Sequence, residues 1–286
     1  MSVEYKPIKV NEWEEFGGGF LCKSFYKKDD DTVMLKLYEA GFDEKEIIKE
    51  HDYAVAVRNA GVKTPECLGL VETDDGRKGV LFQRIKNKKS FARMSADNPE
   101  KAFEYGEVFG TEAKKLHSLK CDKNFFPSKV AELSDIIRKT DIFTKEENEK
   151  IVKFLESNSA DTCIHGDFHF GNLIQTEGEI YWIDLGDFSY GDYRLDLGPF
   201  MFVCVYAQNE ELSKNLFHCD RNTRIEFWKG FVKSYTGIEN DDDRKEFEKS
   251  LMPYMGTYFL FFIKKGLKLN DFELGLIKEC FAPIIK

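Results

Sequence analysis

Hydrophobic and polar residues alternate with a period of two in the first part of the chain, and this alternation predicts β-strands. The runs 20–27 and 32–38 form one predicted hairpin, and the runs 66–72 and 78–85 form a second one around an Asp-Gly turn. A capping-box sequence that begins at Asp43 predicts a helix between the two hairpins. An antiparallel sheet with one helix is therefore expected in this region.

From about residue 86 the spacing of hydrophobic residues becomes that of helices. The polar, lysine-rich stretch 86–90 separates the two patterns. We therefore predict residues 1–85 as a first lobe, 86–90 as a linker and 91–286 as a second, mainly helical lobe. An Asn-Pro sequence at 98–99 and a second capping box at 144–147 mark the starts of two predicted helices. Two longer helical runs follow at 223–235 and 244–265, and Pro253 interrupts the second of them. The expected fold class is α+β.

Composition and charge narrow the function classes. The 286 residues are 42% hydrophobic and 33% charged, which is typical of globular proteins and excludes disordered and fibrous classes. The formal charge of −9 argues against a nucleic-acid partner, because nucleic-acid affinity rests on clustered Lys and Arg, and it would suit a cationic small-molecule substrate. Seven scattered cysteines without a CxxC pair are typical of reduced thiols, and no apolar run approaches the roughly 20 residues that span a bilayer. We expect a soluble, cytoplasmic protein without a membrane partner.

Two charged residues stand where the patterns favour hydrophobic side chains. Strand alternation puts Lys36 on the same face as Met34 and Tyr38, and helical spacing puts Glu50 on or beside the apolar stripe of the predicted helix. Because an unpaired buried charge is costly, each is a natural partner for the other, and such a pair can hold the lysine toward the phosphates of a nucleotide. A lysine that extends to solvent from an edge strand and a solvent-facing glutamate are the alternatives.

Three consecutive glycines, residues 17–19, lie just before the first predicted hairpin. A glycine backbone can approach phosphates closely, so Gly18 and Gly19 are candidate nucleotide-binding residues. The run is not a complete G-x-G-x-x-G, because position 22 is Cys22, and the chain contains no Walker A sequence. A plain turn is the alternative interpretation.

A dense group of polar residues lies in the segment 162–187. If short strands flank the turn that carries Asp167 and Asn172, and a further strand ends at Asp184, these side chains supply the hard oxygen ligands that Mg²⁺ prefers. In phosphoryl transfer, Asp167 would accept the proton of a substrate hydroxyl, while Asn172 and Asp184 would hold Mg²⁺ on the phosphates.

The histidines of this segment allow another interpretation. His165, Asp167 and His169 alternate, so an extended chain would place them on one face as a zinc or di-metal site for hydrolysis. The chain contains no other His-x-His or His-x-x-x-His spacing. A purely structural turn is a third interpretation, although it does not explain why these acidic and amide residues cluster in this order.

The segments 165–172, HGDFHFGN, and 183–187, IDLGD, resemble the HGDxxxxN and IDxxD motifs of the aminoglycoside phosphotransferase and choline kinase-like family. The segment 190–197 is similar to the G-D-P-x-x-D-L segment of that family, with Tyr193 where the pattern favours proline. The strand lysine and the helix glutamate agree with the family in order and spacing. The resemblance therefore spans most of the chain.

This resemblance implies a bilobal, protein-kinase-like fold, in which a small lobe with an antiparallel sheet and one helix binds the nucleotide and a larger helical lobe binds the substrate. The implied cofactors are ATP or GTP and Mg²⁺, and the implied activity is transfer of the γ-phosphate to a hydroxyl group. By similarity, the site consists of the base Asp167, the metal ligands Asn172 and Asp184, the phosphate-contacting Lys36 with its partner Glu50, the adenine-contacting backbone of Gln83 and Ile85, the glycines Gly18 and Gly19, and the supporting residues His165, Asp187 and Asp196.

The acceptor is left open among the compounds that members of the family phosphorylate, which are aminoglycosides, choline, ethanolamine and related amino alcohols or sugars. Aromatic residues of the helical lobe, Phe202 and Tyr258 among them, would suit a quaternary ammonium, but aromatics at helical spacing also form cores. The acidic residues 240–243 would suit a polyamine or simply a solvated helix end. A metal-dependent hydrolase and a pseudokinase that binds nucleotide without transferring phosphate are the alternative functions. The oligomeric state is also left open.

Overall fold

Residues 4–18, 21–264 and 266–286 are described by a computed structural model, and the chain divides into two compact units. The first unit consists of Met1–Lys89 and Ile174–Gly186, and the second consists of Ser90–Leu173 and Asp187–Lys286. Residues 174–186, which lie in the predicted second lobe, thus belong with the first unit. Within the described residues, no helix combines the length and the hydrophobicity that crossing a membrane requires.

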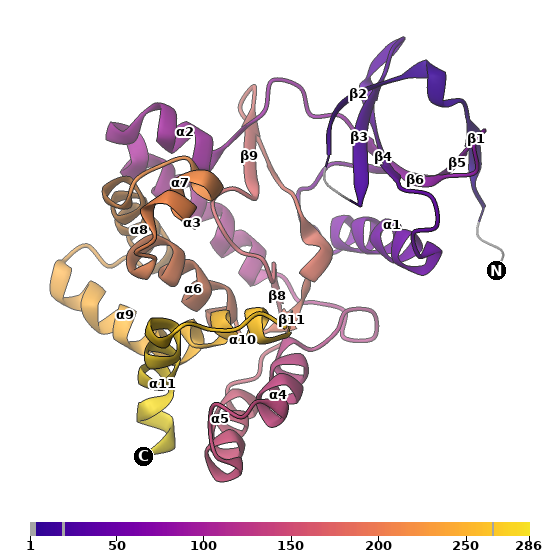
Figure 1. The fold of residues 1–286 in the computed structure, drawn as a ribbon. Helices are drawn as coiled ribbons and strands as arrows, with labels where there is room; N and C mark the ends of the chain where they lie inside the picture. Colours follow the sequence, from indigo (N-terminus) through magenta and orange to yellow (C-terminus); the bar gives the residue numbers. More distant parts are fainter. Residues whose placement is uncertain (1–3, 19–20, 265) are drawn as a thin grey trace. The chain divides into compact units, whose positions relative to one another are not determined.

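The first unit is built on a six-stranded sheet with the order β1-β5-β6-β4-β3-β2 (Figure 1). Adjacent strands pair antiparallel, except β1 and β5, which are parallel. Both predicted hairpins are confirmed as β3 with β4 and β5 with β6. The elements are β1 Lys6–Ile8, a 3-10 turn Val10–Glu12, β2 Trp13–Gly18, β3 Cys22–Lys27, β4 Asp30–Tyr38, α1 Glu44–Asn59, β5 Cys67–Thr73 and β6 Lys78–Gln83.

Strand β4 has the two faces that its alternation predicts. On one face, Leu35 and Leu37 are buried in a cluster with Trp13, Phe25, Val71 and Leu81. On the other face, Tyr38 packs with Ile47 of α1 and with Leu70 and Val80, so this face of the sheet is covered by the helix. Asp43 caps α1 by accepting a hydrogen bond from the Lys45 amide. Lys36 therefore lies on the face that α1 covers.

The segment 174–186 joins the first unit through backbone and side-chain contacts with Lys63. The Trp182 amide donates to the Lys63 carbonyl at 2.8 Å, and the Lys63 ammonium pairs with Glu179. Strands β9 Leu173–Thr176 and β10 Glu179–Trp182 form a small sheet with the order β10-β9-β7, in which β7 is Lys89–Ser90. The chain passes from one unit to the other at residues 89–90, 173–174 and 186–187.

The second unit is mainly helical, as the sequence predicts. Its helices are α2 Phe91–Asp97, α3 Ala102–Ser118, α4 Lys129–Lys139, α5 Lys145–Ser157, α6 Arg194–Met201, α7 Glu210–Phe217, α8 Arg221–Thr236, α9 Asp241–Met255, α10 Thr257–Lys264 and α11 Asp271–Ile285. Shorter elements are the 3-10 turns Pro99–Lys101 and Leu185–Asp187, the π-helical turn Phe202–Tyr206, and the antiparallel strands β8 Thr162–Ile164 and β11 Ser189–Gly191.

Helix boundaries depart from the sequence prediction at two places. The Asn-Pro sequence starts a 3-10 turn, and the α-helix begins only at Ala102. The predicted helix 244–265 is divided into α9 and α10 at Gly256, three residues after Pro253, which lies inside α9. The capping box of α5 is confirmed, because the Thr144 and Glu147 side chains bond each other's backbone amides.

Candidate active site

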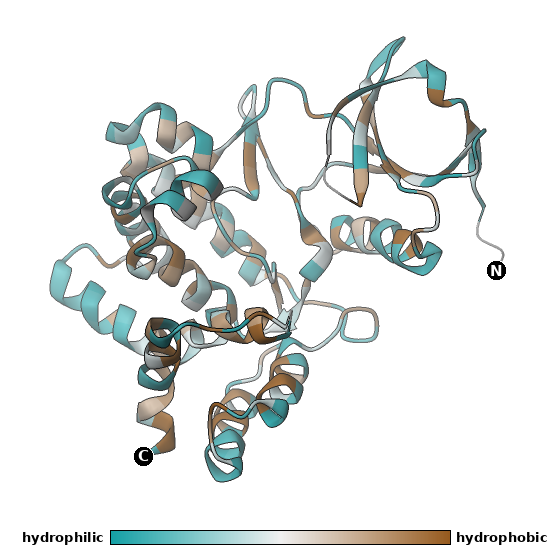
Figure 2. Cartoon of the chain, viewed as in Figure 1, coloured by the Kyte–Doolittle hydropathy of each residue, from teal (hydrophilic) through white to brown (hydrophobic). Residues whose placement is uncertain are grey.

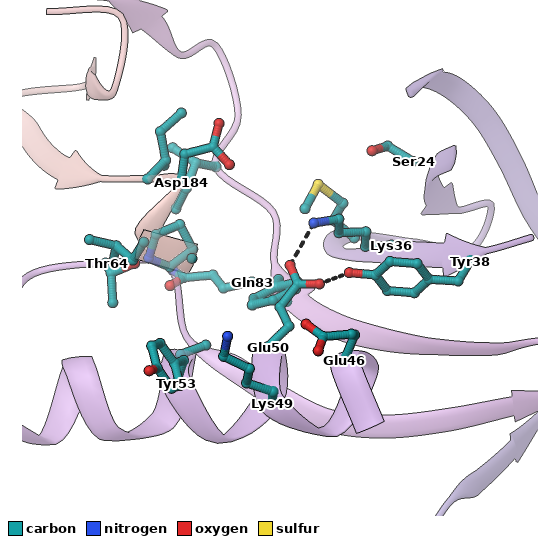
Figure 3. Close-up of a pocket in the computed structure, with 18 of the residues that line it drawn as sticks. Ser24, Lys36, Tyr38, Glu46, Lys49, Glu50, Tyr53, Thr64, Gln83 and Asp184 are labelled. Carbon is teal, nitrogen blue, oxygen red and sulfur yellow. Dashed lines mark hydrogen bonds and ion pairs between the residues drawn. The ribbon is translucent and has the colours of Figure 1, made fainter. Parts of the chain in front are cut away.

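A pocket of about 530 Å³ lies within the first unit, between β4, α1, the end of β6 and the turn after β10 (Figure 3). It brings together Lys36, Glu50, Gln83, Ile85 and Asp184, five of the residues that the sequence predicts for nucleotide and metal binding. Two stretches separated by about a hundred residues in the sequence thus line one cavity.

Lys36 and Glu50 form the ion pair that the sequence predicts. Lys36 Nζ lies 2.6 Å from Glu50 Oε1, and the two side chains are only 29% and 25% exposed. Burial alone would lower the pKa of Lys36, but the Glu50 charge and hydrogen bond raise it above its usual value. The Tyr38 hydroxyl donates to the second oxygen of Glu50, so the carboxylate is held from two sides (Figure 3).

Asp184 faces the same pocket from the turn after β10. Its backbone has φ 61°, a left-handed conformation that is uncommon for a residue with a side chain. The charge of Asp184 contributes to the raised pKa of Lys36. Lys88 also lines the pocket, where burial lowers its pKa and Asp184 opposes that shift. Lys88 was not among the predicted site residues, because it lies in the lysine-rich stretch 86–90 that we predicted as a linker.

Gln83 is the last residue of β6, Ile85 follows two residues later, and both line the pocket. The Gln83 amide donates to the Glu66 carbonyl at 2.8 Å, and the Arg84 amide donates to Thr32 at 2.7 Å. Both amides are therefore used inside the sheet, and a backbone donor toward a ligand would come from Ile85. Of the two predicted glycines, Gly18 is the last residue of β2 and pairs with Lys23, whereas Gly19 lies outside the described residues.

In the second unit, Asp167 and Asn172 lie in the turn that follows β8. The Asn172 side-chain amide donates to the Asp167 carbonyl at 2.9 Å and to Asp167 Oδ2 at 3.1 Å. Burial would raise the pKa of Asp167, but His169 and Asn172 bring it below its usual value. The lowered pKa keeps the carboxylate ionised at neutral pH, and the side chain is 54% exposed, so a ligand can reach it.

The two histidines of the motif do not form the metal site that the hydrolase alternative needs. Nδ1 of the fully buried His165 accepts the Asp167 amide at 3.3 Å, and Nδ1 of His169 accepts the Gly171 amide at 3.1 Å. Nε2 of His169 lies 3.6 Å from the Asp167 carboxylate. Among the residues that the structure describes, no group of three His, Cys, Asp or Glu side chains is arranged to hold a metal ion.

Asp196 holds the backbone just before Asp167. Its carboxylate is 1% exposed and accepts the His165 amide at 2.7 Å and the Gly166 amide at 2.9 Å. Gly166 has φ 84°, and any side chain there would collide with the Asp187 carbonyl. The backbone of Asp187 and the side chain of Asp196 thus enclose the turn.

Tyr193 stands where the family pattern favours proline, and it adopts a backbone angle that proline also has. Its φ is −55° and its ψ is −24°, and it is the N-cap position of α6. Asp192 accepts the Arg194 amide at 2.9 Å and pairs with the Arg194 guanidinium. The backbone angles of Tyr193 are therefore ones that a proline at this position could also adopt.

Many of the aromatic residues of the helical region belong to its core, whereas Tyr258 interacts electrostatically with Asp167. Phe200, Phe227, Trp228 and Phe231 are at most 1% exposed. Phe202 and Tyr258 stack with ring centroids 4.5 Å apart, and burial together with the Asp167 charge raises the pKa of Tyr258 to about 12. Within this stacked pair, Tyr258 is the ring that interacts with the Asp167 charge.

The acidic residues 240–243 form the exposed start of α9, which is hydrophilic in Figure 2. Asn240 caps the helix at the Asp243 amide, and Asp241 and Asp242 pair with Arg244 and Lys245. Local hydrogen bonds and ion pairs account for this run, because acidic residues are favourable in the first turn of a helix.

The model of the phosphotransferase enzyme family (APH) matches residues 12–218, which is most of the chain. The chain belongs to this family. The family resemblance inferred from the HGDFHFGN and IDLGD segments is thus confirmed. The protein is a small-molecule kinase. No curated protein matches this phosphotransferase at a significant level.

Solved structures of kinases resemble this phosphotransferase over nearly its full length. The amicoumacin kinase hAmiN with AMP-PNP, Ca²⁺ and Ami is 11% identical, covers 99% of this chain and 90% of its own, and has a TM-score of 0.55. The streptomycin–ATP–APH(2")-IIa complex is 17% identical (95% and 91% covered, TM-score 0.55). A choline/ethanolamine kinase family protein from Mesorhizobium loti is 15% identical (94% and 87% covered, TM-score 0.51). At such identities the likeness concerns the fold, and it confirms the predicted α+β, protein-kinase-like class.

Proposed function

We propose that this phosphotransferase moves the γ-phosphate of ATP or GTP, with Mg²⁺, to a hydroxyl group of a small molecule. The observation that carries the proposal is the Lys36–Glu50 ion pair beside Asp184 in the pocket of the first unit. Solved relatives by fold were determined with ATP or AMP-PNP and, in one case, with Ca²⁺, which supports nucleotide and divalent-cation binding here.

In this proposal the pocket of the first unit binds the nucleotide. Lys36, held by Glu50, contacts the phosphates, and the backbone of Gln83 and Ile85 meets the base edge. Lys36 remains charged at neutral pH because the Glu50 carboxylate raises its pKa. Gly18 and Gly19 remain proposed phosphate contacts. We keep residues 1–85, 86–90 and 91–286 as the proposed lobes, with residues 174–186 contributing Asp184 to the nucleotide pocket.

The proposed metal ligands, Asn172 and Asp184, have the donor chemistry that Mg²⁺ requires. The Asn172 amide nitrogen is committed to Asp167, and no hydrogen bond to Asn172 Oδ1 is present within the described part of the chain. The Asp184 carboxylate lines the pocket as a second hard oxygen donor. When bound, the cation would neutralise charge on the nucleotide phosphates.

Asp167 is the proposed base. Its depressed pKa keeps the carboxylate ionised at neutral pH, and its exposure allows a substrate hydroxyl to reach it. His165, Asp187 and Asp196 support the turn that carries it. Acceptors of the classes that relatives use, namely aminoglycosides, choline or ethanolamine and sugars, are the first candidates, and the acidic net charge of the chain favours a cationic one. We place the reaction in the cytoplasm.

A screen for acceptor-stimulated ATP and GTP consumption tests the proposal. The panel contains aminoglycosides, amino alcohols and sugars, and each reaction is run with and without Mg²⁺. We expect at least one hydroxyl compound to stimulate consumption in a Mg²⁺-dependent way. Nucleotide binding without consumption for any acceptor would favour the pseudokinase alternative, and metal-dependent hydrolysis without nucleotide would favour the hydrolase.

A further inference from the structure

Helices α3 and α8 pack with their backbones in direct contact. Three glycines make this possible, because a Cβ at any of them would overlap atoms of the opposite helix. The overlapping pairs would be Gly106 with the Phe227 carbonyl, Gly110 with the Ser234 hydroxyl, and Gly230 with the Phe103 carbonyl. The same packing brings the end of α8 against the end of α3.

At that end, Tyr235 of α8 meets His117 of α3. The Tyr235 hydroxyl lies 2.9 Å from His117 Nδ1, and His117 Nε2 lies 3.1 Å from Asp196 Oδ2. His117 and Asp196 are 3% and 1% exposed. Since a carboxylate only accepts hydrogen bonds, Nε2 carries a proton, and in the Nε2–H tautomer Nδ1 accepts from the Tyr235 hydroxyl. The hydrogen bonds therefore run in one direction, from Tyr235 through His117 to Asp196.

Asp196 extends this chain of hydrogen bonds to the turn that carries Asp167. The same Oδ2 that faces His117 accepts the His165 amide at 2.7 Å, and Oδ1 accepts the Gly166 amide at 2.9 Å. These are the amides of the two residues immediately before Asp167. Rotation of the Asp196 carboxylate would change the position of both amides, so its orientation sets the path of the turn.

The Tyr193 ring packs against two members of this chain of hydrogen bonds, His117 and Tyr235. Its ring centroid lies 6.1 Å from that of His117 and 5.9 Å from that of Tyr235. Burial and the neighbouring Tyr193 and Asp196 raise the pKa of Tyr235, so its hydroxyl stays protonated and able to donate. The family pattern favours proline at this position, and a proline could not make these aromatic ring contacts.

We propose that Tyr235 is a positioning residue for Asp167 and acts through His117 and Asp196. The inference rests on the proposed function, since it assigns Tyr235 a part in the reaction of Asp167. The match to the family model ends at residue 218, so Tyr235 lies beyond the matched segment. Helix α8 thus contributes to the site through the hydrogen bond of Tyr235 to His117.

Tyr235→Phe tests the proposal, because it removes one hydroxyl and keeps the ring. We expect kcat to fall by about 10-fold while KM for the nucleotide stays unchanged, since a misplaced reacting group slows the reaction without loss of binding in the other unit. Tyr254→Phe is the matched control: Tyr254 is 1% exposed on α9, and its hydroxyl has no hydrogen-bond partner within the described residues. This control is expected to keep the wild-type kcat.

A second measurement reports the hydrogen bonds directly. In ¹⁵N NMR of histidine-labelled protein, with His117 assigned by its loss in His117→Gln, we expect the Nε2–H tautomer in the wild type and a shifted Nδ1 resonance in Tyr235→Phe. Equal kcat values for Tyr235→Phe and the wild type, or an Nδ1–H tautomer of His117, would overturn the inference. If instead no acceptor is phosphorylated by the wild type, the proposed function itself fails, and the two failures are thereby distinguished.

Discussion

The ammonium group of Lys36 lies 2.6 Å from the carboxylate of Glu50, on the face of β4 that α1 covers. A second donor, the Tyr38 hydroxyl, occupies the other oxygen of that carboxylate. Because Glu50 is fixed by both a cation and a hydroxyl, Lys36 is held in one orientation inside the pocket. This arrangement is the basis of the first prediction.

Glu50→Gln keeps the shape of the side chain and its bond to Tyr38 but removes the charge that orients Lys36. We expect KM for the nucleotide to rise by about 10-fold or more, because a charge-assisted hydrogen bond in a half-buried site is lost. Initial rates of the purified variant at increasing nucleotide concentrations give this KM, and a nucleotide titration gives the affinity. Asp135→Asn is the control, since Asp135 pairs with Lys139 at an exposed position where ion pairs contribute little. Equal nucleotide affinity of both variants would show that Glu50 does not position Lys36.

Asp167→Asn removes the proposed base without changing the size of the side chain. We expect kcat to fall by about 100-fold to 10,000-fold, the usual range for loss of a general base. Binding of nucleotide should be retained, because the pocket that contains Lys36 and Glu50 belongs to the other unit. Steady-state rates together with nucleotide titration separate the two effects. A kcat close to that of the wild type would remove Asp167 from the reaction.

The acid limb of the pH–rate profile follows from the pKa of Asp167. The base acts in its ionised form, and His169 and Asn172 hold its pKa below the ordinary carboxyl value of about 3.9 despite burial. Activity that depends on Asp167 is therefore fully present above that value and is lost only as the pH falls below it. With an acceptor that does not titrate, kcat/KM should be constant from pH 8 to about pH 5. A limb near pH 6 would mean that another group controls the reaction.

Gly106→Ala tests the contact between α3 and α8. The added Cβ would overlap the Phe227 carbonyl, a backbone atom that cannot rotate away, so we expect a loss of about 3 kcal/mol or more in the free energy of unfolding. Gly275→Ala, inside α11 and open to solvent, is the matched control and should stabilise the protein by about 0.5–1 kcal/mol through helix propensity. Denaturant unfolding of both variants measures the difference. Equal free energies of unfolding for the two variants would show that the contact between α3 and α8 can accommodate a Cβ at residue 106.

Local patterns were sufficient to predict the elements of the first unit and the partnership of Lys36 with Glu50. Each is a charged residue at a position where the local pattern favours a hydrophobic side chain, Lys36 in a strand and Glu50 in a helix, so each could be recognised from its neighbours in the sequence. The turn of Asp167 and Asn172 was recognised from its motif, and the structure adds the hydrogen bonds that join them.

The remaining features depend on contacts between distant segments. Nothing near His117 in the sequence indicates that it is buried between Asp196 and Tyr235, because this depends on the close approach of α3 and α8. Residues 174–186 carry ordinary strand patterns, and only their contacts with Lys63 place them in the first unit. The helix break at Gly256 was displaced from Pro253 because proline weakens a turn without fixing the residue at which the helix ends.

In the proposed reaction, Asp167 directs phosphate from a nucleotide to a hydroxyl group. The most direct measurement is ³¹P NMR of a reaction containing ATP, Mg²⁺ and the acceptor identified by the consumption screen, with wild-type protein and with Asp167→Asn. We predict that a phosphate monoester resonance grows with ADP in equal amount for the wild type and is absent over the same time for the variant. Release of inorganic phosphate without a monoester, or equal monoester formation by the variant, would contradict the claim.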